Sequence, residues 1–331
     1  MSLSIGVVGV GQLGFHHARI LKSLEGVRMA GVFDIRPQRA DQVARELGVR
    51  AWPSLDDLLK DADAVVVAVP TTAHEEVAVA ALARGRHVLV EKPMATDLAA
   101  ADRILAAAAA SGALVQIGHV ERFNPAVLAA EPFLERPLFI ESHRLAAFSS
   151  RSTDVAVVLD LMIHDVDLVG SLVGRPVLEI AAAGVAVLTP SPDIANARLS
   201  FEGGAVANLT ASRISRERMR KLRIFQPSGY LSLNLADGTG EFLRLKTGLR
   251  ELPAAGGGPS WPENGLAGIV DRIPLKGDGA EPLCRELENF RDAVQGAARP
   301  AVSGTEGRAT LAVTLSIEER IRSHVAHSRP A

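Results

Sequence analysis

A glycine-rich loop near the N-terminus constrains the fold of this chain more than any other feature. The loop reads Gly9-Val10-Gly11-Gln12-Leu13-Gly14. It follows an apolar run at residues 5–8 and precedes an amphipathic pattern at residues 18–24, which predicts a strand, a tight loop and the start of a helix. In such a unit the glycines let the backbone approach a pyrophosphate, and the N–H groups of the helix face it.

Asp34 supports a dinucleotide site. It lies twenty positions beyond Gly14 and ends the apolar run at residues 29–33. An acidic residue at this place binds a ribose 2′-hydroxyl and repels a 2′-phosphate, whereas Arg36 nearby partly offsets the repulsion. We therefore expect NAD as the cofactor, with NADP as the alternative.

Residues 1–120 alternate strand-like and helix-like patterns. Short apolar runs occur at residues 5–8, 29–33, 64–69, 87–90 and 114–117. This alternation predicts an α/β domain with a doubly wound parallel sheet, which binds its ligands at the carboxyl ends of the strands. The loops at that edge carry the glycine motif, Asp34, Pro70-Thr71-Thr72 and Glu91-Lys92-Pro93.

The pattern changes in residues 121–331, which we expect to form a second, α+β domain. Helical patterns at residues 124–134 and 159–172 precede consecutive β-type runs between residues 178 and 245. Consecutive strands favour an open, mostly antiparallel sheet. Residues 248–280 are rich in glycine and proline and predict an irregular excursion, and helical patterns at residues 282–295 and 305–324 follow it.

The composition excludes several classes of protein. The chain has 331 residues, of which 47% are hydrophobic and 22% charged, as in ordinary globular proteins. A net charge of −2 gives no reason to expect nucleic acid or a membrane surface as partner, and the apolar runs are too short to span a bilayer. Cys284 is the only cysteine, which fits a reducing cytoplasm, and no secretory signal pattern precedes the first strand.

Lys92, Asp160 and His164 are the candidate catalytic residues. Hydride transfer to a nicotinamide needs a group that removes the hydroxyl proton. Lys92 follows a strand at the ligand edge, although a surface lysine beside Pro93 is the alternative. Asp160 and His164 lie four apart on a predicted helix and share a face, so the histidine can act as a general base. The alternatives are a helix-capping Asp160 with a packed His164, or a metal site, and we expect no metal.

Other polar residues are candidates for binding. Arg122 and Asn124 follow the last strand of the first domain, where Asn124 and Pro125 also fit a capped helix start. A solvated face is the default for the other basic residues, but a subset can clamp a diphosphate. These are Arg151, Arg213, Arg216, Arg218 and Arg220. His74 can lie near the nicotinamide ribose, whereas His16, His17 and His87 fit structural roles better.

The chain resembles the Gfo/Idh/MocA oxidoreductases over almost its whole length. The resemblance rests on the glycine loop followed by His17-Ala18, on Val69-Pro70-Thr71 with His74, on residues 85–93 ending in Glu91-Lys92-Pro93, on residues 160–165, and on Glu281-Pro282-Leu283 with Glu286. It implies a Rossmann domain plus an open-sheet domain, a bound NAD(H) or NADP(H), and a sugar-like or polyol substrate. Lys92 would be the family lysine, His164 the base and Asp160 its neighbour.

Two stretches, residues 118–125 and 154–167, are similar to a branch of the family that oxidises the 3-hydroxyl of a nucleotide sugar such as UDP-N-acetylglucosamine. Ala156 departs from that pattern, where glycine is expected. The alternatives are a myo-inositol or free-aldose dehydrogenase, and a regulatory protein that senses NAD without turnover. The resemblance also implies a homodimer or homotetramer through the sheet of the second domain.

Overall fold

The computed structural model describes residues 2–148, 156–246, 268 and 270–328, and the chain divides into two compact units. The first unit comprises residues 1–123 and 280–315, and the second comprises residues 124–279 and 316–331. Residues 280–315 thus return to the first unit after the second has been traversed. Among the described residues, no helix combines the length and the apolar character needed to cross a membrane.

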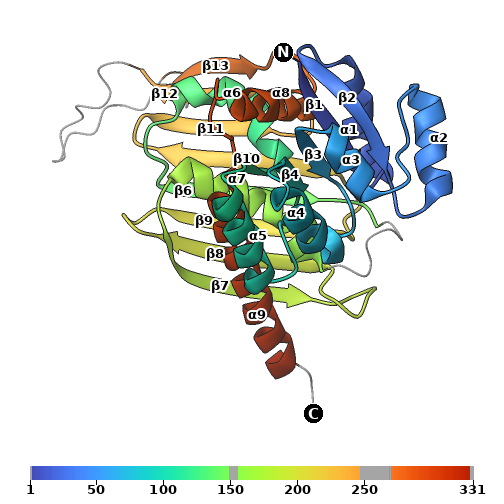
Figure 1. Ribbon diagram of the computed structural model, residues 1–331. Helices are drawn as coiled ribbons and strands as arrows, with labels where there is room; N and C mark the ends of the chain where they lie inside the picture. The colour runs from blue at the N-terminus through green and yellow to red at the C-terminus, as the bar shows by residue number, and fades with distance from the viewer. Residues whose placement is uncertain (1, 149–155, 247–267, 269, 329–331) are drawn as a thin grey trace, which may run out of the picture. The chain divides into compact units, whose positions relative to one another are not determined.

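The first unit is built on a five-stranded parallel sheet in the order β2-β1-β3-β4-β5 (Figure 1). Its strands are β1 Leu3–Val8, β2 Val27–Phe33, β3 Ala64–Val67, β4 His87–Glu91 and β5 Val115–Gly118. β3 and β4 are buried at almost every position, as strands covered on both faces must be. The order reverses between β1 and β3, where doubly wound sheets bind their ligands.

A further strand beside β2 is reduced to a single bridge between Val32 and Ala51. The Val32 N–H donates to the Arg50 carbonyl at 2.8 Å, and the Trp52 N–H donates to the Val32 carbonyl at 2.9 Å. Gly31 makes room for this segment, because a Cβ there would lie 2.5 Å from the Arg50 oxygen. The bridge stands where a doubly wound sheet of this type has its third strand.

Helices cover both faces of this sheet. They are α1 Gln12–Ser23, α2 Pro37–Leu47, α3 Leu55–Asp61, α4 His74–Leu82 and α5 Leu98–Ser111. Ser54 and Asp97 cap α3 and α5, since each side chain accepts a hydrogen bond from the N–H three residues on. α8 (Pro282–Val294) packs on α1, and its Leu287 and Phe290 belong to the same buried core as Ile5 and Val7.

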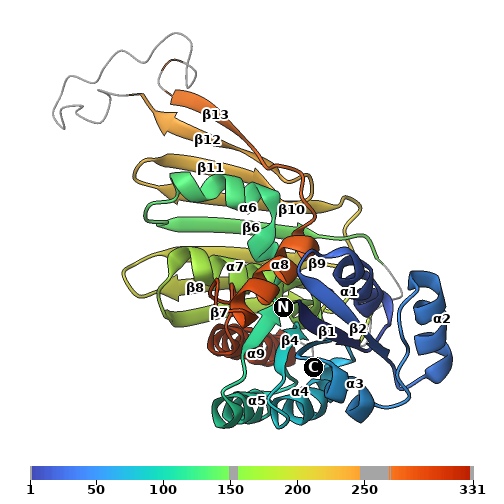
Figure 2. The ribbon, with the colours of Figure 1, turned by 45° about the horizontal axis from the view of Figure 1, so that its top comes forward.

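The second unit contains an eight-stranded sheet in the order β13-β12-β11-β10-β6-β9-β8-β7 (Figure 2). The strands are β6 Phe139–Leu145, β7 Val177–Val185, β8 Ile194–Phe201, β9 Val206–Ser212, β10 Met219–Gln226, β11 Gly229–Asn234, β12 Thr239–Leu245 and β13 Val270–Lys276. Only the β6–β9 pair is parallel among these described strands. The expected combination of a parallel Rossmann sheet and a mostly antiparallel sheet is confirmed.

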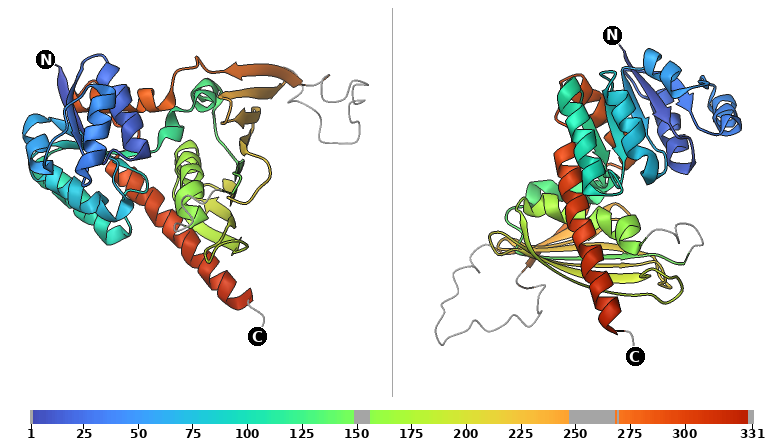
Figure 3. Two further views of the ribbon diagram at one scale, coloured as in Figure 1. Left: turned by 90° about the vertical axis from the view of Figure 1, so that its right-hand side faces the viewer. Right: turned by 60° about the horizontal axis from the view of Figure 1, so that its bottom comes forward.

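One face of this sheet is covered and the other is open. α6 (Pro125–Ala130) packs on β11, β12 and β13, and α7 (Ile163–Val173) packs on β6 and β9. Side chains along β6 alternate between buried and half-buried, which is the pattern of a sheet with one covered face. Figure 3 shows the strands as one twisted layer. The open face carries Phe139, Phe225 and Tyr230, whose rings contact each other in series.

Three expectations about local structure are wrong. The helix expected at residues 124–134 ends at Ala130, and Pro132 sits in a separate 3₁₀ turn, η3 Glu131–Phe133. The helix expected at residues 159–172 begins instead with a π-helical turn, η4 Val158–Met162. Val270–Lys276, within the expected irregular excursion, is the edge strand β13, where Pro274 is tolerated because an edge strand can leave one side unpaired. Residues 248–267 and 269 of that excursion lie outside the described residues.

Candidate active site

The glycine loop of the first unit has the shape that a dinucleotide requires. Gly9 has φ +82°, and a Cβ there would lie 2.8 Å from the Ala68 oxygen. A Cβ at Gly14 would lie 1.8 Å from the Gly9 oxygen, so only glycine allows α1 to pack this closely on the loop. A Cβ at Gly11 would meet nothing within 4 Å. Gly11 therefore faces open space at the N-terminus of α1, where a pyrophosphate fits.

Apolar side chains at the same edge remain exposed. Leu13, in the first turn of α1, is 52% exposed, and Ile35, directly after Asp34, is 89% exposed. Such residues offer apolar contact to the flat rings of a dinucleotide. Together with the glycine geometry they show that this loop fits the cofactor implied by the sequence.

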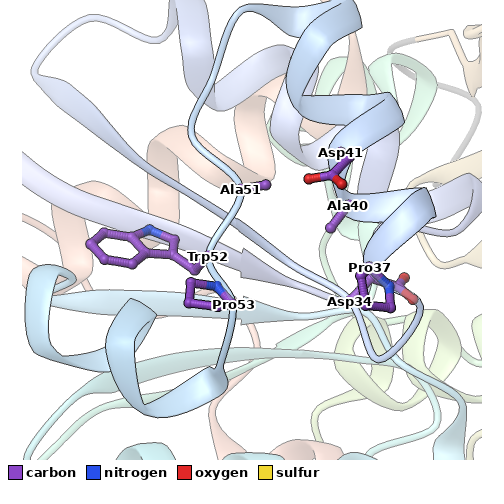
Figure 4. Close-up of a pocket in the computed structure, with 7 residues that line it drawn as sticks. All are labelled: Asp34, Pro37, Ala40, Asp41, Ala51, Trp52 and Pro53. Carbon is purple, nitrogen blue, oxygen red and sulfur yellow. The ribbon is translucent and has the colours of Figure 1, made fainter.

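Asp34 is buried at the end of β2 and braces the glycine loop. Its Oδ2 accepts a hydrogen bond from the Val10 N–H at 2.9 Å, and its Oδ1 accepts one from the Arg36 N–H at 2.9 Å. Arg39, which the sequence did not single out, donates from Nε to the Val10 carbonyl at 2.7 Å. A cavity of about 330 Å³ adjoins Asp34 and is large enough for part of a nucleoside (Figure 4). It is lined by Asp34, Pro37, Ala40, Asp41, Ala51, Trp52 and Pro53.

The loop after β3 is tied to the loop after β4 by His74. The ring Nε2 lies 3.0 Å from the Val69 carbonyl oxygen, and Nδ1 lies 2.9 Å from the Pro93 carbonyl oxygen. Burial lowers the pKa of His74, and these hydrogen bonds together with the charge of Glu91 oppose the shift only in part. Pro70 and Thr71 stand at the tip of this loop, Pro70 exposed and Thr71 half-buried. His74 thus links the two loops, because its ring contacts a backbone carbonyl in each of them.

Lys92 follows β4 directly and is half-buried, and the peptide bond between Lys92 and Pro93 is cis. Glu91, which precedes it, turns into the interior of the first unit. Its Oε1 accepts a hydrogen bond from His17 Nε2 at 2.7 Å. His17 is fully buried. His87, at the start of β4, accepts a hydrogen bond from the Leu114 N–H through its Nδ1 at 2.9 Å.

Asp160 and His164 lie in the second unit on either side of a change in helix type. Asp160 belongs to the π-helical turn η4, and His164 is the second residue of α7. Both are half-buried. A π-turn widens a helix locally and occurs frequently at functional sites, so this turn marks the segment independently of its sequence motif.

Arg144 of β6 holds the residue that follows His164. Arg144 Nε donates to Asp165 Oδ2 at 2.9 Å, and Nη2 donates to Oδ1 at 2.9 Å. Neither residue was singled out on its own, although Asp165 stands within the motif at residues 160–165. A planar guanidinium facing a carboxylate in this way fixes orientation as well as distance.

The remaining candidates differ in their surroundings. Asn124 caps α6, because its Oδ1 accepts the Ala126 N–H at 3.0 Å, and its Nδ2 donates to the Leu235 carbonyl at 2.9 Å. Arg122 is half-buried, Arg213 is buried, and Arg216 and Arg218 are exposed. Arg151 lies outside the described residues.

The fold and these loops define an oxidoreductase with a dinucleotide-binding domain, and family models agree. Residues 3–119 match the oxidoreductase family with an NAD-binding Rossmann fold, and residues 127–232 match the GFO/IDH/MocA C-terminal domain. The chain therefore belongs to the Gfo/Idh/MocA family of NAD-binding oxidoreductases, as the sequence motifs indicate. It is a dehydrogenase that takes a nicotinamide dinucleotide as its cofactor.

Individual relatives narrow the resemblance. The chain is 37% identical over 321 residues to the UDP-N-acetylglucosamine 3-dehydrogenase of Acidithiobacillus ferrooxidans, covering 96% of this chain and 97% of that one. A solved structure of the same name and organism has a TM-score of 0.89 at 34% identity and covers 99% of this chain and 100% of that one. The myo-inositol 2-dehydrogenase of Thermotoga maritima is 25% identical, covering 96% of this chain and 97% of that relative.

Proposed function

We propose that this protein oxidises the 3-hydroxyl of a nucleotide sugar such as UDP-N-acetylglucosamine to a ketone, with NAD as the preferred acceptor. The observation that carries the proposal is the similarity, at 37% identity and over 96% of this chain, to a dehydrogenase of that specificity. The inositol dehydrogenases match either over less of this chain, as at 36% identity over 193 residues, or at lower identity, as at 25% over 341 residues. They make polyols the second substrate class to test.

The bound nicotinamide supplies a hydride acceptor for the carbinol carbon. We assign His164 as the general base that takes the hydroxyl proton, and Asp160 as the carboxylate that stabilises the protonated ring. Lys92 donates a hydrogen bond to the carbinol oxygen as the carbonyl forms. The π-turn next to His164 and the position of Lys92 at the end of β4 support these roles.

The cofactor is held by the glycine loop, the end of β2 and the loops after β3 and β4. The glycine loop supplies Gly9, Gly11, Gln12, Leu13 and Gly14. The end of β2 supplies Asp34 and Arg36, and Pro70, Thr71, His74, Glu91 and Lys92 act from the other two loops. Asp34 favours NAD over NADP because a second negative charge would lie beside its buried carboxylate.

Arg122, Asn124 and Arg151, together with Asp160 and His164, form the proposed substrate set. Asn124 contributes to this set indirectly, by capping α6, because its side-chain Oδ1 and Nδ2 both already hydrogen-bond to the backbone. We also propose a dimer or tetramer that buries the open face with Phe139, Phe225 and Tyr230. The single free Cys284 suits the reducing cytoplasm.

The test is a panel of UDP-N-acetylglucosamine, UDP-glucose, free N-acetylglucosamine, myo-inositol and scyllo-inositol, each with NAD and with NADP. We expect nicotinamide reduction with UDP-N-acetylglucosamine and NAD, and little with the free sugar or the inositols. Turnover of an inositol in preference to every nucleotide sugar overturns the substrate assignment. Lys92→Met keeps the length of the side chain and removes its charge and donors, and we expect it to bind NAD without turnover.

A further inference from the structure

Three residues from distant parts of the sequence meet inside the first unit. They are His17 in α1, Glu91 at the end of β4 and Glu286 in α8, and one side-chain oxygen or nitrogen of each lies within 4.8 Å of those of the others. All three are buried, with 0%, 8% and 1% of their surfaces exposed. We call them the Glu91 cluster. Each lies in a sequence motif of the family, but none of the three side chains has a chemical step in the proposed reaction.

Glu91 connects this cluster to Lys92. Its Oε1 binds His17 Nε2 at 2.7 Å, and its Oε2 accepts a hydrogen bond from the backbone N–H of Lys92 at 3.2 Å. Gly118 on the neighbouring strand leaves space for the carboxylate, since a Cβ there would lie 3.2 Å from Oε2. Both oxygens of Glu91 are thus directed at protein groups on either side of it.

The charge of Glu91 is maintained despite its burial. Burial raises its pKa, but the hydrogen bond and charge of His17 and the charge and N–H of Lys92 outweigh this effect and hold the pKa below its ordinary value. Glu91 is therefore an anion at neutral pH. The titratable groups that face it are His17 from α1, His74 from α4, Glu286 from α8 and Lys92 from its own loop.

Packing alone does not require such a cluster. A buried carboxylate costs several kcal/mol unless it is well paired, and an apolar side chain of similar volume is often as stable or more so. The helix α1 and the start of α8 are also joined at the surface, where Arg19 Nη2 donates to Glu281 Oε1 at 2.6 Å. An ionised, hydrogen-bonded group directly before Lys92 fits a role in placing that lysine.

We propose that Glu91 is a positioning residue, which His17 holds in place and which fixes Lys92 relative to the helix that begins at the dinucleotide loop. The inference rests on the proposed role of Lys92. In this role Glu91 does not contact the cofactor directly, as the proposed cofactor set has it, but acts on the site through Lys92 and α1. Because His17 is on α1, the same carboxylate connects the helix at the pyrophosphate site to the catalytic lysine.

The test compares Glu91→Gln and His17→Asn with Glu281→Gln as the matched control. Glu91→Gln keeps the shape and removes the charge, and His17→Asn leaves the carboxylate but withdraws its partner in α1. We expect both to bind NAD almost as the native protein does and to lose about 10²-fold in kcat, which is the scale of a small misplacement at a reacting group. The kcat–pH profile of Glu91→Gln should also move to lower pH, because an anion beside the Lys92 ammonium is gone. Glu281→Gln should leave kcat unchanged.

Several outcomes overturn the proposal. Unchanged kcat and pH profile in both variants, with Lys92→Met inactive, rule out positioning by Glu91 while the proposed function stands. If Lys92→Met itself turns over substrate, the proposed function fails first. If Glu91→Gln loses NAD affinity but keeps a normal kcat at saturating NAD, Glu91 contacts the cofactor directly and is not a positioning residue. A divalent metal that purifies in equal amount with the protein and is lost in Glu91→Gln makes the cluster a metal site instead. If Glu91→Gln does not fold, His17→Asn decides.

Discussion

Arg144 and Asp165 form a two-pronged ion pair inside the second unit, with both N–O distances at 2.9 Å and side chains only 4% and 3% exposed. Arg144 is on β6, which has neighbours on both sides in the sheet, and Asp165 directly follows His164. The pair therefore joins the first turn of α7 to the middle of the sheet. It restricts rotation of the helix that presents the proposed base.

Arg144→Met should destabilise the protein by about 3–5 kcal/mol, because it leaves the Asp165 carboxylate buried without this partner. Urea unfolding at neutral pH measures the change. Arg223→Met is the matched control, since Arg223 makes a 3.4 Å pair with Glu141 between β10 and β6 and is 41% exposed. That variant should change stability by less than about 1 kcal/mol. Equal stability of the two variants would show that the buried pair does not hold α7.

His164→Ala should lower kcat by a factor on the order of 10²–10⁴, the usual contribution of a positioned general base. NAD affinity should change little, because the glycine loop and Asp34 belong to the other unit. Steady-state rates and a direct NAD titration separate the two effects. His143→Ala, a half-buried histidine of β6, is the control and should retain turnover. Most of the native rate in His164→Ala would make this histidine structural.

Asp34→Ser should shift cofactor preference toward NADP. Removal of a negative charge near a 2′-phosphate is worth on the order of 1–4 kcal/mol, so the ratio of NADP to NAD affinity should rise about tenfold or more. Asp41→Ser removes a carboxylate from the same cavity and should have a much smaller effect. Titrations of both dinucleotides against the three proteins give the ratios. A native protein that already prefers NADP contradicts the role given to Asp34.

Stability should decrease as the pH falls below about 6.5, and His74 should account for part of the decrease. Burial holds the pKa of His74 below its ordinary value, so the unfolded chain binds a proton more readily than the folded protein does. Its contribution is complete above the ordinary pKa and is lost as the pH falls toward the lower folded value. His87 shifts in the same direction through burial.

Thermal unfolding of His74→Gln between pH 5 and pH 7 tests this expectation. The variant should show a shallower dependence on pH, whereas substitution of the exposed His16 should leave the slope unchanged. An identical slope in His74→Gln and the native protein assigns the pH dependence to other groups.

The periodic parts of this fold follow from the sequence. The five strands of the first unit were expected close to where they occur, because runs such as Val65-Val66-Val67 are short, β-branched and apolar at every position, as in a strand covered on both faces. α8 and α9 (Gly304–Ser328) also match their expected spans closely. The bridge between Val32 and Ala51 was not predicted, because a single bridging residue leaves no periodic pattern in the sequence.

Some local irregularities and the contacts between residues far apart in the chain were not predicted from the sequence, for physical reasons. A π-turn shifts the phase of a helical pattern, but residues 157–163 are apolar at every position except Asp160 and hide the shift, so residues 159–172 indicated one continuous α-helix. β6 was not expected, because its alternation includes the buried Ser142 and Arg144 on the covered face. The role of Arg144 follows only from its contact with Asp165, and the role of His17 follows only from its contact with Glu91. Such pairs depend on the tertiary fold and not on local spacing.

The return of residues 280–315 to the first unit has a consequence for synthesis on the ribosome. When residue 123 leaves the exit tunnel, the dinucleotide-binding sheet lacks α8, so the apolar surface that Leu287 and Phe290 cover in the finished protein is still uncovered. About half of the chain, the segment at residues 124–279, must follow before α8 is made. The N-terminal domain therefore cannot mature as an independent unit in the order of translation. A fragment that ends near residue 123 should aggregate, and its solubility should recover when a peptide spanning α8 is supplied.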